Sequence, residues 1–278
     1  MIYLVLAVIS SALISIFMRL GETKASGKLG MLATNYLMCL VIAGIFNGFG
    51  GGLPTGQGVG QAVGLGAVNG VLYLLGFILF QVNIRRNGVV LSSIFMKLGL
   101  LVPIVLSICF FGEVPELVQI IGFCIAVAAI VLINLEKQQT AMEFKAGLIL
   151  LLLAGGSADA MSKVFEEVGN SAFSEQFLLC TFAVATILCV VLMICRKERP
   201  GKKEILYGLL IGIPNYFAAR FLLKSLESIS AVIVYPTYSV GTIVAVAIAG
   251  VCFFHEQLGK RQWLGVGAIL VALILLNI

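Results

Sequence analysis

Long apolar runs separated by short polar connections occupy almost the whole chain. Each run is roughly 20 residues long, the length that an α-helix needs to span a hydrocarbon core of about 30 Å. Helices suit such runs because hydrocarbon forces every backbone group to be satisfied internally, and the runs are too long for barrel strands. The pattern predicts an all-α integral membrane protein with ten transmembrane helices, at about 2–20, 29–48, 60–82, 88–111, 117–135, 146–165, 175–195, 204–223, 229–251 and 262–278.

An internal repeat organises these runs. The stretch CFFGEVPELVQIIGFCIAVAAIVLIN at Cys109–Asn134 recurs 143 residues later as CFFHEQLGKRQWLGVGAILVALILLN at Cys252–Asn277. Nine of the 26 paired positions are identical, and they include a Glu, a Gln and an Asn in a chain with few polar residues. We therefore expect two five-helix repeats, 1–140 and 141–278. Because five is odd, the second repeat enters the membrane from the opposite side, which makes the pair an inverted repeat.

The charges lie in the connections. The chain is 60% apolar and 11% charged, where a soluble domain has about 25% charged residues. The loops after the first, third, fifth, seventh and ninth runs are basic, whereas those after the second and fourth contain no Lys or Arg. By the positive-inside rule, this bias predicts that both termini face outward. The basic loop residues are Lys24, Lys28, Arg85, Arg86, Lys137, Lys145, Arg196, Lys197, Arg199, Lys202, Lys203, Lys260 and Arg261.

No catalytic, metal-binding or cofactor-binding pattern accompanies the runs. The chain has one histidine, His255, and seven cysteines that fall in or beside apolar runs without a CxxC spacing. No paired intramembrane carboxylates and no serine or metal hydrolase motif are present. We therefore expect no enzyme activity, no cofactor, no metal and no nucleic acid partner.

Glycines recur at four-residue spacing in the run 60–82, as Gly60/Gly64 and Gly66/Gly70. Glycine at this spacing allows two helix backbones to approach closely in lipid. We interpret these residues as a packing face within the helix bundle.

Lys97 is the deepest charge in the chain, near the middle of the run 88–111, with Ser93 one turn before it. A lysine at this depth costs about 2.5–3.5 kcal/mol on insertion scales, so it needs a compensating role. Lys97 and Ser93 could line a polar substrate cavity. Lys97 could equally be an interior side chain that is bound to backbone carbonyls or to a buried carboxylate. Pro103 is expected to kink this helix because proline lacks a backbone donor.

Asp159 is the one acidic residue well inside an apolar run, and Lys163 follows it by one helical turn. This spacing favours either a self-contained ion pair or a coupling site that binds a proton or a cation. Arg19 aligns with Lys163 in the other repeat, near a helix end from which it could snorkel to headgroups. Alternatively, Arg19 and Lys163 act as two gates on opposite sides of the membrane.

Polar and aromatic side chains in three other runs complete the predicted cavity. Several of them share a helix face, and two flank Pro236, where a broken helix would expose backbone groups. Tyrosines near helix ends can also be interfacial anchors. The predicted cavity residues of this group are Asn69, Tyr73, Tyr216, Arg220, Tyr235 and Tyr238.

The sequence resembles the EamA-like branch of the drug/metabolite transporter superfamily. The resemblance rests on FFGE at Phe110–Glu113, FFHE at Phe253–Glu256 and an Asn that ends each closing run, and it covers the whole chain. It implies a ten-helix secondary carrier that works by alternating access. It also implies that the first, third, fourth, sixth, eighth and ninth runs line the path, with the fifth and tenth at the periphery. The outward termini depart from many relatives.

These observations predict a multi-pass protein of the plasma or inner membrane that transports a small polar metabolite without ATP. If Arg19, Lys97, Lys163, Arg220 and Asp159 all face the path, its charge is +3 (four minus one), which favours an amino-acid-like or anionic substrate. The alternative function is a flippase or an accessory subunit for a lipid-linked or amphipathic molecule. The expected partners are the bilayer and a small-molecule substrate, with or without a coupled proton or counter-substrate, in a monomer or a homodimer.

Overall fold

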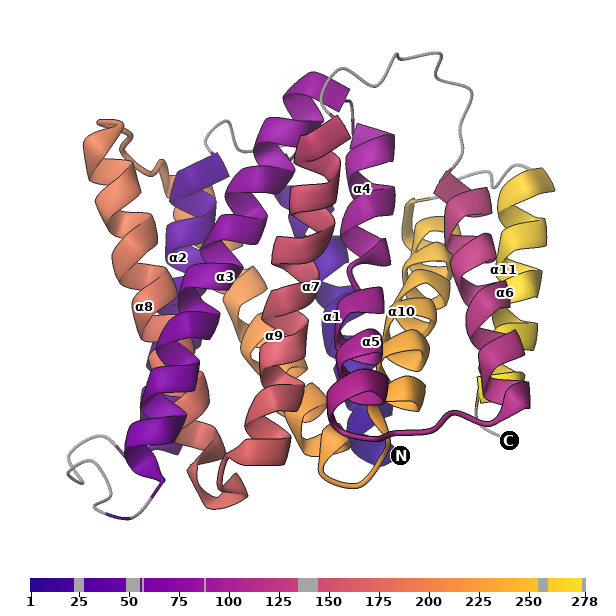
Figure 1. The fold of residues 1–278 in the computed structure, drawn as a ribbon. Helices are drawn as coiled ribbons and strands as arrows, with labels where there is room; N and C mark the ends of the chain where they lie inside the picture. The colour runs from indigo at the N-terminus through magenta and orange to yellow at the C-terminus, as the bar shows by residue number, and fades with distance from the viewer. Residues whose placement is uncertain are drawn as a thin grey trace. The chain divides into compact units, whose positions relative to one another are not determined.

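The computed structural model describes residues 1–22, 28–48, 56, 58–87, 89–134, 145–254 and 260–276. Within these ranges the chain forms helices and turns and contains no strand, which confirms the predicted all-helical class (Figure 1). The helices are α1 (Ile2–Glu22), α2 (Lys28–Phe46), α3 (Val59–Asn87), α4 (Val89–Leu98), α5 (Leu101–Phe110), α6 (Leu117–Asn134), α7 (Lys145–Val168), α8 (Ser174–Cys195), α9 (Lys202–Leu226), α10 (Ala231–Phe254) and α11 (Lys260–Leu276), with a 3-10 turn at Ser171–Phe173.

Many of these helices have the length and composition of a membrane span. Within the described residues, six apolar segments are long enough to cross a bilayer: Leu29–Phe46, Val59–Phe80, Ala146–Val168, Ser171–Cys195, Lys202–Leu226 and Ala231–Cys252. Four shorter apolar segments accompany them, at Ile2–Met18, Phe95–Phe110, Leu117–Leu132 and Trp263–Leu276. The exact number of ten spans stays a prediction.

The run 88–111 is interrupted in the structure. Helix α4 ends at Leu98, two residues form a turn, and α5 begins at Leu101. Pro103 explains the position of the break, because it cannot donate a hydrogen bond to the carbonyl of Gly99 one turn earlier. The turn instead uses shorter-range bonds, from Gly99 N to Met96 O (3.2 Å), Leu100 N to Lys97 O (3.4 Å) and Val102 N to Gly99 O (2.9 Å). The predicted kink is therefore a break that lies directly after Lys97.

The chain forms two compact units. Unit 1 contains residues 1–74 and 164–227, and unit 2 contains residues 75–163 and 228–278. The divisions fall inside α3 and α7, so each unit combines segments from both predicted repeats. The repeat boundary near residue 140 concerns the sequence duplication and stays a prediction.

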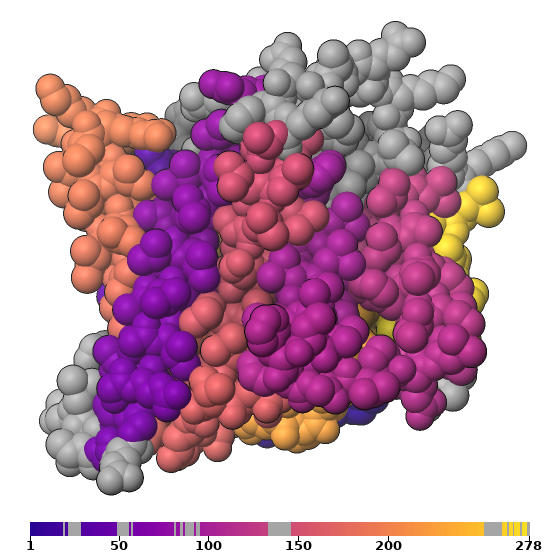
Figure 2. Space-filling view, viewed as in Figure 1, coloured from indigo at the N-terminus to yellow at the C-terminus, as the bar shows by residue number. Residues whose placement is uncertain are grey.

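In unit 1, α9 packs against α1 and α2, and α8 packs against α2. Helix α3 lies against α8 through two glycines, and the two helices run side by side in Figures 1 and 2. A Cβ atom at Gly66 or at Gly70 would lie 2.5 Å from a carbonyl oxygen of α8. The predicted glycine packing face is thus confirmed for this pair. Gly60 and Gly64 have no atom within 4 Å of a Cβ position, so they do not belong to that face.

In unit 2, α6 packs against α11, and α10 packs against α5 and α6. The turn after α4 approaches α7 even more closely. A Cβ atom at Gly156 of α7 would collide with the carbonyl oxygen of Gly99. Two glycines without side chains therefore allow the end of α4 to touch α7, and this contact brings Lys97 of α4 and Asp159 of α7 into one region.

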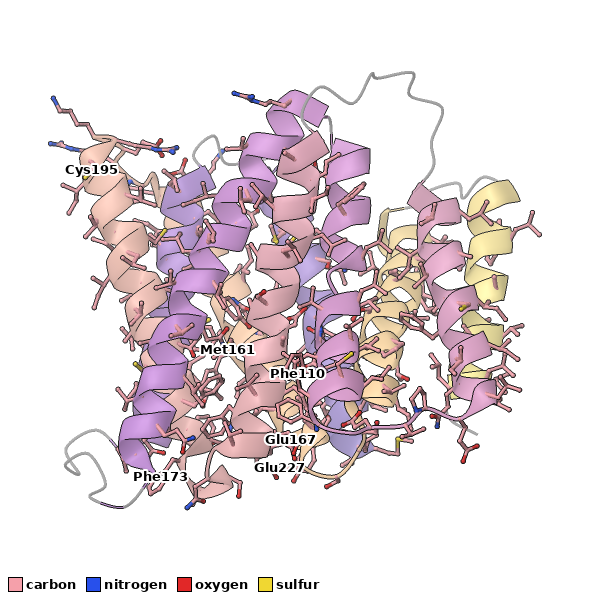
Figure 3. The ribbon with its side chains drawn as sticks, in the orientation of Figure 1. Phe110, Met161, Glu167, Phe173, Cys195 and Glu227 are labelled. Atoms are coloured by element: carbon pink, nitrogen blue, oxygen red, sulfur yellow. The ribbon has the colours of Figure 1, made fainter. Side chains whose placement is uncertain are left out.

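The two ends of unit 1 differ in charge. Figure 3 shows Cys195 at one end and Phe173, Glu167 and Glu227 at the other. The connection from α8 into α9 at the Cys195 end carries five basic and two acidic residues, and the described segments 166–175 and 220–227 at the opposite end carry four acidic and two basic residues. The first group is Arg196, Lys197, Arg199, Lys202, Lys203, Glu198 and Glu204, and the second is Glu166, Glu167, Glu175, Glu227, Arg220 and Lys224.

We expect the Cys195 end of unit 1 to face the cytoplasm, because basic residues are enriched in cytoplasmic loops. Cys195 is exposed, so a membrane-impermeant maleimide should reach it only after the cells are permeabilised. The Cys195→Ser variant identifies the labelled site. Ala172→Cys in that background, at the opposite exposed end, should react in intact cells. Labelling of Cys195 from outside intact cells would reverse the assignment.

Candidate functional site

A buried ion pair ties α7 to the loop between α5 and α6. Lys163 Nζ lies 2.9 Å from Glu113 Oε1, and the two side chains are 3% and 15% exposed. The Lys163 ammonium also lies over the ring of Phe111 in the same loop, 5.9 Å from its centre. Removal of one partner from a buried pair is strongly destabilising, by about 3–5 kcal/mol, since an uncompensated charge remains.

Glu113 also caps α10. Its carboxylate accepts hydrogen bonds from Ser230 Oγ (2.6 Å), Ala231 N (3.2 Å) and Val232 N (3.2 Å). These donors belong to the start of α10, where backbone N–H groups have no partner within the helix and where the helix dipole favours an anion. Glu113 therefore joins three elements at one carboxylate: its own loop, α7 and α10.

Burial raises the pKa of the Glu113 carboxyl, but its hydrogen bonds and the charge of Lys163 outweigh burial. The bonds come from Ser230, Lys163 and the N–H of Ala231, and together they hold the pKa below its ordinary value. The charged form is thus favoured in the folded protein.

The ion pair between Asp159 and Lys163, one of the two predicted arrangements, is not formed. The Lys163 ammonium binds Glu113 instead, although Asp159 lies one turn away on the same helix. The physical reason is that three donors at the start of α10 hold the Glu113 carboxylate in place within 2.9 Å of the Lys163 ammonium. Lys163 thus secures the loop after α5.

Lys97 and Asp159 lie close to the backbone contact between Gly99 and Gly156 and form no ion pair with each other. Their charges attract each other, yet neither makes an ion pair or a side-chain hydrogen bond with any described residue. Both side chains are partly exposed. Intramembrane charges almost always face the bundle interior or a water-filled cavity, which makes this pair a candidate for contact with a substrate.

Tyr235 holds the backbone beside this pair. The side chain is 1% exposed, and its hydroxyl donates a 2.7 Å hydrogen bond to the carbonyl oxygen of Asp159. Because that hydroxyl is used to position α7 against α10, Tyr235 acts on the pair through the backbone. Tyr238, one turn further, is partly buried, and its carbonyl accepts a 2.7 Å bond from Thr242 Oγ1.

Unit 1 contains a second charged cluster, around Glu175 at the start of α8. Arg220 binds Glu175 Oε1 through Nε (2.7 Å) and Nη2 (2.6 Å), and the Tyr216 hydroxyl donates to Oε2 (2.7 Å). The Arg220 guanidinium stacks on the ring of Phe46, 4.1 Å from its centre. Asn47 Nδ2 donates to the Glu175 carbonyl at 2.9 Å. Arg220 is thus neutralised by Glu175 and covered by the Phe46 ring, while Tyr216 and Asn47 hold Glu175.

The remaining predicted residues are only partly placed by the structure. Asn69 is 2% exposed, and its Oδ1 has no hydrogen-bond partner in the part of the chain that the structure describes. Tyr73 contacts the Phe182 ring edge-on, with centres 6.2 Å apart. The side chains of Ser93 and Arg19 lie outside the described side chains.

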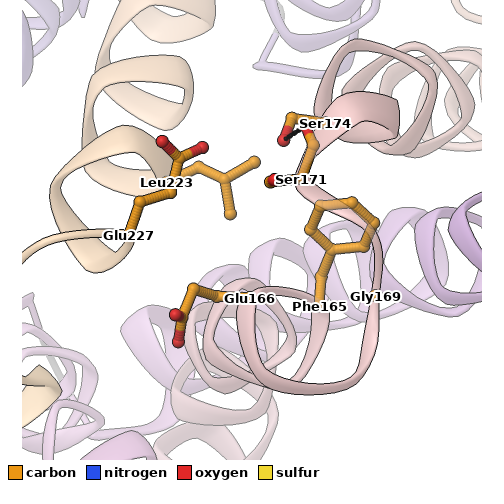
Figure 4. Close-up of a pocket in the computed structure, with 7 residues that line it drawn as sticks. All are labelled: Phe165, Glu166, Gly169, Ser171, Ser174, Leu223 and Glu227. Carbon is orange, nitrogen blue, oxygen red and sulfur yellow. Dashed lines mark hydrogen bonds between the residues drawn. The ribbon is translucent and has the colours of Figure 1, made fainter.

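A small pocket opens at the acidic end of unit 1 (Figure 4). Its volume is about 180 Å³, too small for most metabolites. Two carboxylates and two serine hydroxyls face an apolar wall of one aromatic and one aliphatic side chain. The lining residues are Phe165, Glu166, Gly169, Ser171, Ser174, Leu223 and Glu227.

Sequence reasoning missed Glu175 and treated Glu113 as a turn residue of the repeat motif. Glu175 stands at a helix start, where acidic residues are common, so its distant partners Tyr216 and Arg220 leave no local signal. Glu113 had a usable signal, because an acidic residue in each repeat precedes an apolar run and could serve a helix terminus. Among the described residues, no cluster of His, Cys, Asp or Glu could hold a metal ion.

The helices and their compensated charges define a multi-pass membrane protein. The chain belongs to the EamA-like transporter family, whose sequence pattern matches residues 1–135 and again 145–278. This match confirms the resemblance to the drug/metabolite transporter superfamily. The family is one of transporters and not of enzymes.

Individual relatives are more distant. The chain is 24% identical over 196 residues to an uncharacterized protein of Haemophilus influenzae, with 68% of this chain and 67% of the relative covered. It is 33% identical over 101 residues to the probable 4-amino-4-deoxy-L-arabinose-phosphoundecaprenol flippase subunit ArnE of Klebsiella pneumoniae, with 34% of this chain and 89% of ArnE covered. One solved crystal structure shares the fold with a TM-score of 0.71 at 15% identity, over 99% of this chain and 98% of that one.

The Glu113–Lys163 ion pair predicts that the two single variants lose different amounts of stability and that their effects are not additive. Glu113→Gln removes the carboxylate from a buried ammonium and should cost about 3–5 kcal/mol of unfolding free energy. Lys163→Met leaves Glu113 bonded to α10 and should cost about 1–3 kcal/mol. The double variant should be more stable than Glu113→Gln alone. Unfolding of the purified protein in detergent measures all three, with Glu116→Gln, an exposed residue of the same loop, as the control. Additive losses in the double variant would contradict the pairing.

Glu113 also predicts a pH dependence of stability. Because its folded pKa is depressed, its contribution is present above the unfolded pKa, near the ordinary value of 4.5, and is lost as pH falls through the folded pKa. The difference in melting temperature between wild type and Glu113→Gln should therefore shrink as the pH is lowered from 7 to 3. A constant difference over that range would show that the Glu113 charge does not contribute.

Proposed function

We propose that this protein is a secondary transporter that moves a small polar metabolite, amino-acid-like or anionic, across the plasma or inner membrane by alternating access. The observation that carries the proposal is the open Lys97–Asp159 pair in a member of a transporter family. Carriers built from inverted repeats bind substrate near the middle of the membrane, commonly at interrupted helices. Lys97 stands at such an interruption, directly before the turn that separates α4 from α5.

The structure changes the charge argument for the substrate. Two of the four cations counted toward a path charge of +3 are neutralised, Lys163 by Glu113 and Arg220 by Glu175. Of the described charges, Lys97 and Asp159 are left to face a substrate, and they balance each other. This balance favours an amino-acid-like substrate over a simple anion.

The residues predicted for coupling and gating keep a place in the proposed cycle. Asp159 is the proposed site for a coupled proton or cation, and Lys163 and Arg19 are the proposed gates. Ser93 beside Lys97 stays a predicted substrate contact, and so, each by itself, do Asn69, Tyr73, Tyr216, Arg220, Tyr235 and Tyr238. We keep the division into repeats 1–140 and 141–278 and the ten inverted spans as part of this proposal.

A second candidate function is a flippase, or a flippase subunit, for a lipid-linked molecule. The observation that favours it is the 33% identity to ArnE over 101 residues, although this segment covers 34% of the chain. A flippase requires a path open to the lipid, whereas a charged pair such as Lys97–Asp159 suits a substrate that is polar at both ends.

Flux in proteoliposomes tests the transporter. Saturable uptake of a radiolabelled amino or organic acid should be lost in Lys97→Ala, because the ligand would lose its cationic partner. Lys203→Gln, an exposed residue at the start of α9, is the matched control and should retain full flux. Uptake that survives Lys97→Ala intact would remove Lys97 from the mechanism, and movement of labelled lipid without uptake of any acid would favour the flippase.

A further inference from the structure

We propose that Lys97 and Asp159 are the two poles of a binding site for a small zwitterion, which carries a carboxylate and an ammonium group on one molecule. The inference rests on the proposed transporter function and goes beyond it by assigning the two ends of the substrate. The substrate carboxylate binds the Lys97 ammonium, and the substrate ammonium binds the Asp159 carboxylate.

The first observation is that this pair forms no ion pair, unlike Lys163 and Arg220. Lys163 and Arg220 each contact a carboxylate at hydrogen-bond distance. Lys97 and Asp159 attract each other but form no ion pair, with each other or with another described residue. Two opposite charges that form no ion pair in the described structure are available to a ligand that is itself dipolar.

The second observation is that the backbone fixes the spacing of the two charges. Gly99 and Gly156 touch, two residues after Lys97 and three residues before Asp159. Tyr235 donates to the carbonyl oxygen of Asp159 at 2.7 Å. These contacts fix the backbone beside each charge, and a site that is fixed in advance avoids part of the ordering cost of binding.

Charge balance then sets the selectivity. A zwitterion satisfies both poles and adds no net charge to the site. An anion of the same carbon skeleton leaves Asp159 without a partner and is repelled by it, and a cation does the same at Lys97. Charge-assisted hydrogen bonds are roughly twice as strong as neutral ones, so the loss of either contact should be large.

Matched ligand sets test the assignment. We would use L-alanine, L-leucine and L-phenylalanine, each beside the acid that lacks its amino group and the amine that lacks its carboxyl group. Binding is measured by competition in proteoliposomes that contain the full-length protein. At least one zwitterion should bind at least about tenfold more tightly than its acid and its amine.

Two variants that each remove one charge should each abolish a different part of this selectivity. Asp159→Asn should abolish the preference for the zwitterion over its acid, and Lys97→Gln should abolish the preference over its amine. If the two residues had only a structural role, each variant would weaken the binding of all three ligands together. The loss of one preference in each variant is therefore specific to the proposal. Glu198→Gln and Lys203→Gln remove exposed charges near the α8–α9 loop and should leave selectivity unchanged.

The outcomes separate this inference from the proposed function. The inference is wrong, while the transporter stands, if an acid without an amino group is transported as well as any zwitterion. It is equally wrong if the Asp159→Asn variant still prefers the zwitterion over the acid that lacks the amino group. If no amino or organic acid is transported and labelled lipid crosses the bilayer instead, both are wrong.

Discussion

A charge inside a bilayer must be compensated, and this requirement accounts for much of the structure. At the loop after α5, Glu113 compensates Lys163 and at the same time caps α10. One carboxylate thereby fixes the ends of three elements in unit 2. The same requirement is met in unit 1, where Glu175 binds Arg220 and Tyr216 at the start of α8. Lys97 and Asp159, in contrast, form no ion pair with any residue that the structure describes.

Two glycines bring the elements that carry Lys97 and Asp159 together. Two helices that carry charges usually separate far enough for their side chains, but Gly99 and Gly156 bring the backbones of the α4–α5 turn and α7 into contact. Pro103 ends α4 in the same region by removing a backbone donor. An interrupted helix, a close backbone contact and two opposite charges thus coincide within unit 2. This coincidence connects the fold to the proposed substrate.

Much of the fold could be predicted from the sequence, because in lipid the length and polarity of a run decide its secondary structure. The apolar runs became helices, Pro103 marked the interrupted run, and Gly66 and Gly70 formed a packing face. The partners of the charges could not be predicted in the same way. Lys163 had a carboxylate one turn away, yet it binds Glu113, and Arg220 binds Glu175, because tertiary contacts bring together residues that are distant in sequence.

The central claim is that the substrate carboxylate contacts the Lys97 ammonium. Solid-state NMR tests it most directly, through the dipolar coupling between the 15Nζ label of lysine and the 13C-labelled carboxyl carbon of bound L-alanine, L-leucine or L-phenylalanine. The account predicts a coupling for at least one of these ligands that disappears in Lys97→Arg, where the labelled atom is absent. A bound ligand with no coupling to Lys97, or with a coupling that persists in Lys97→Arg, would contradict it.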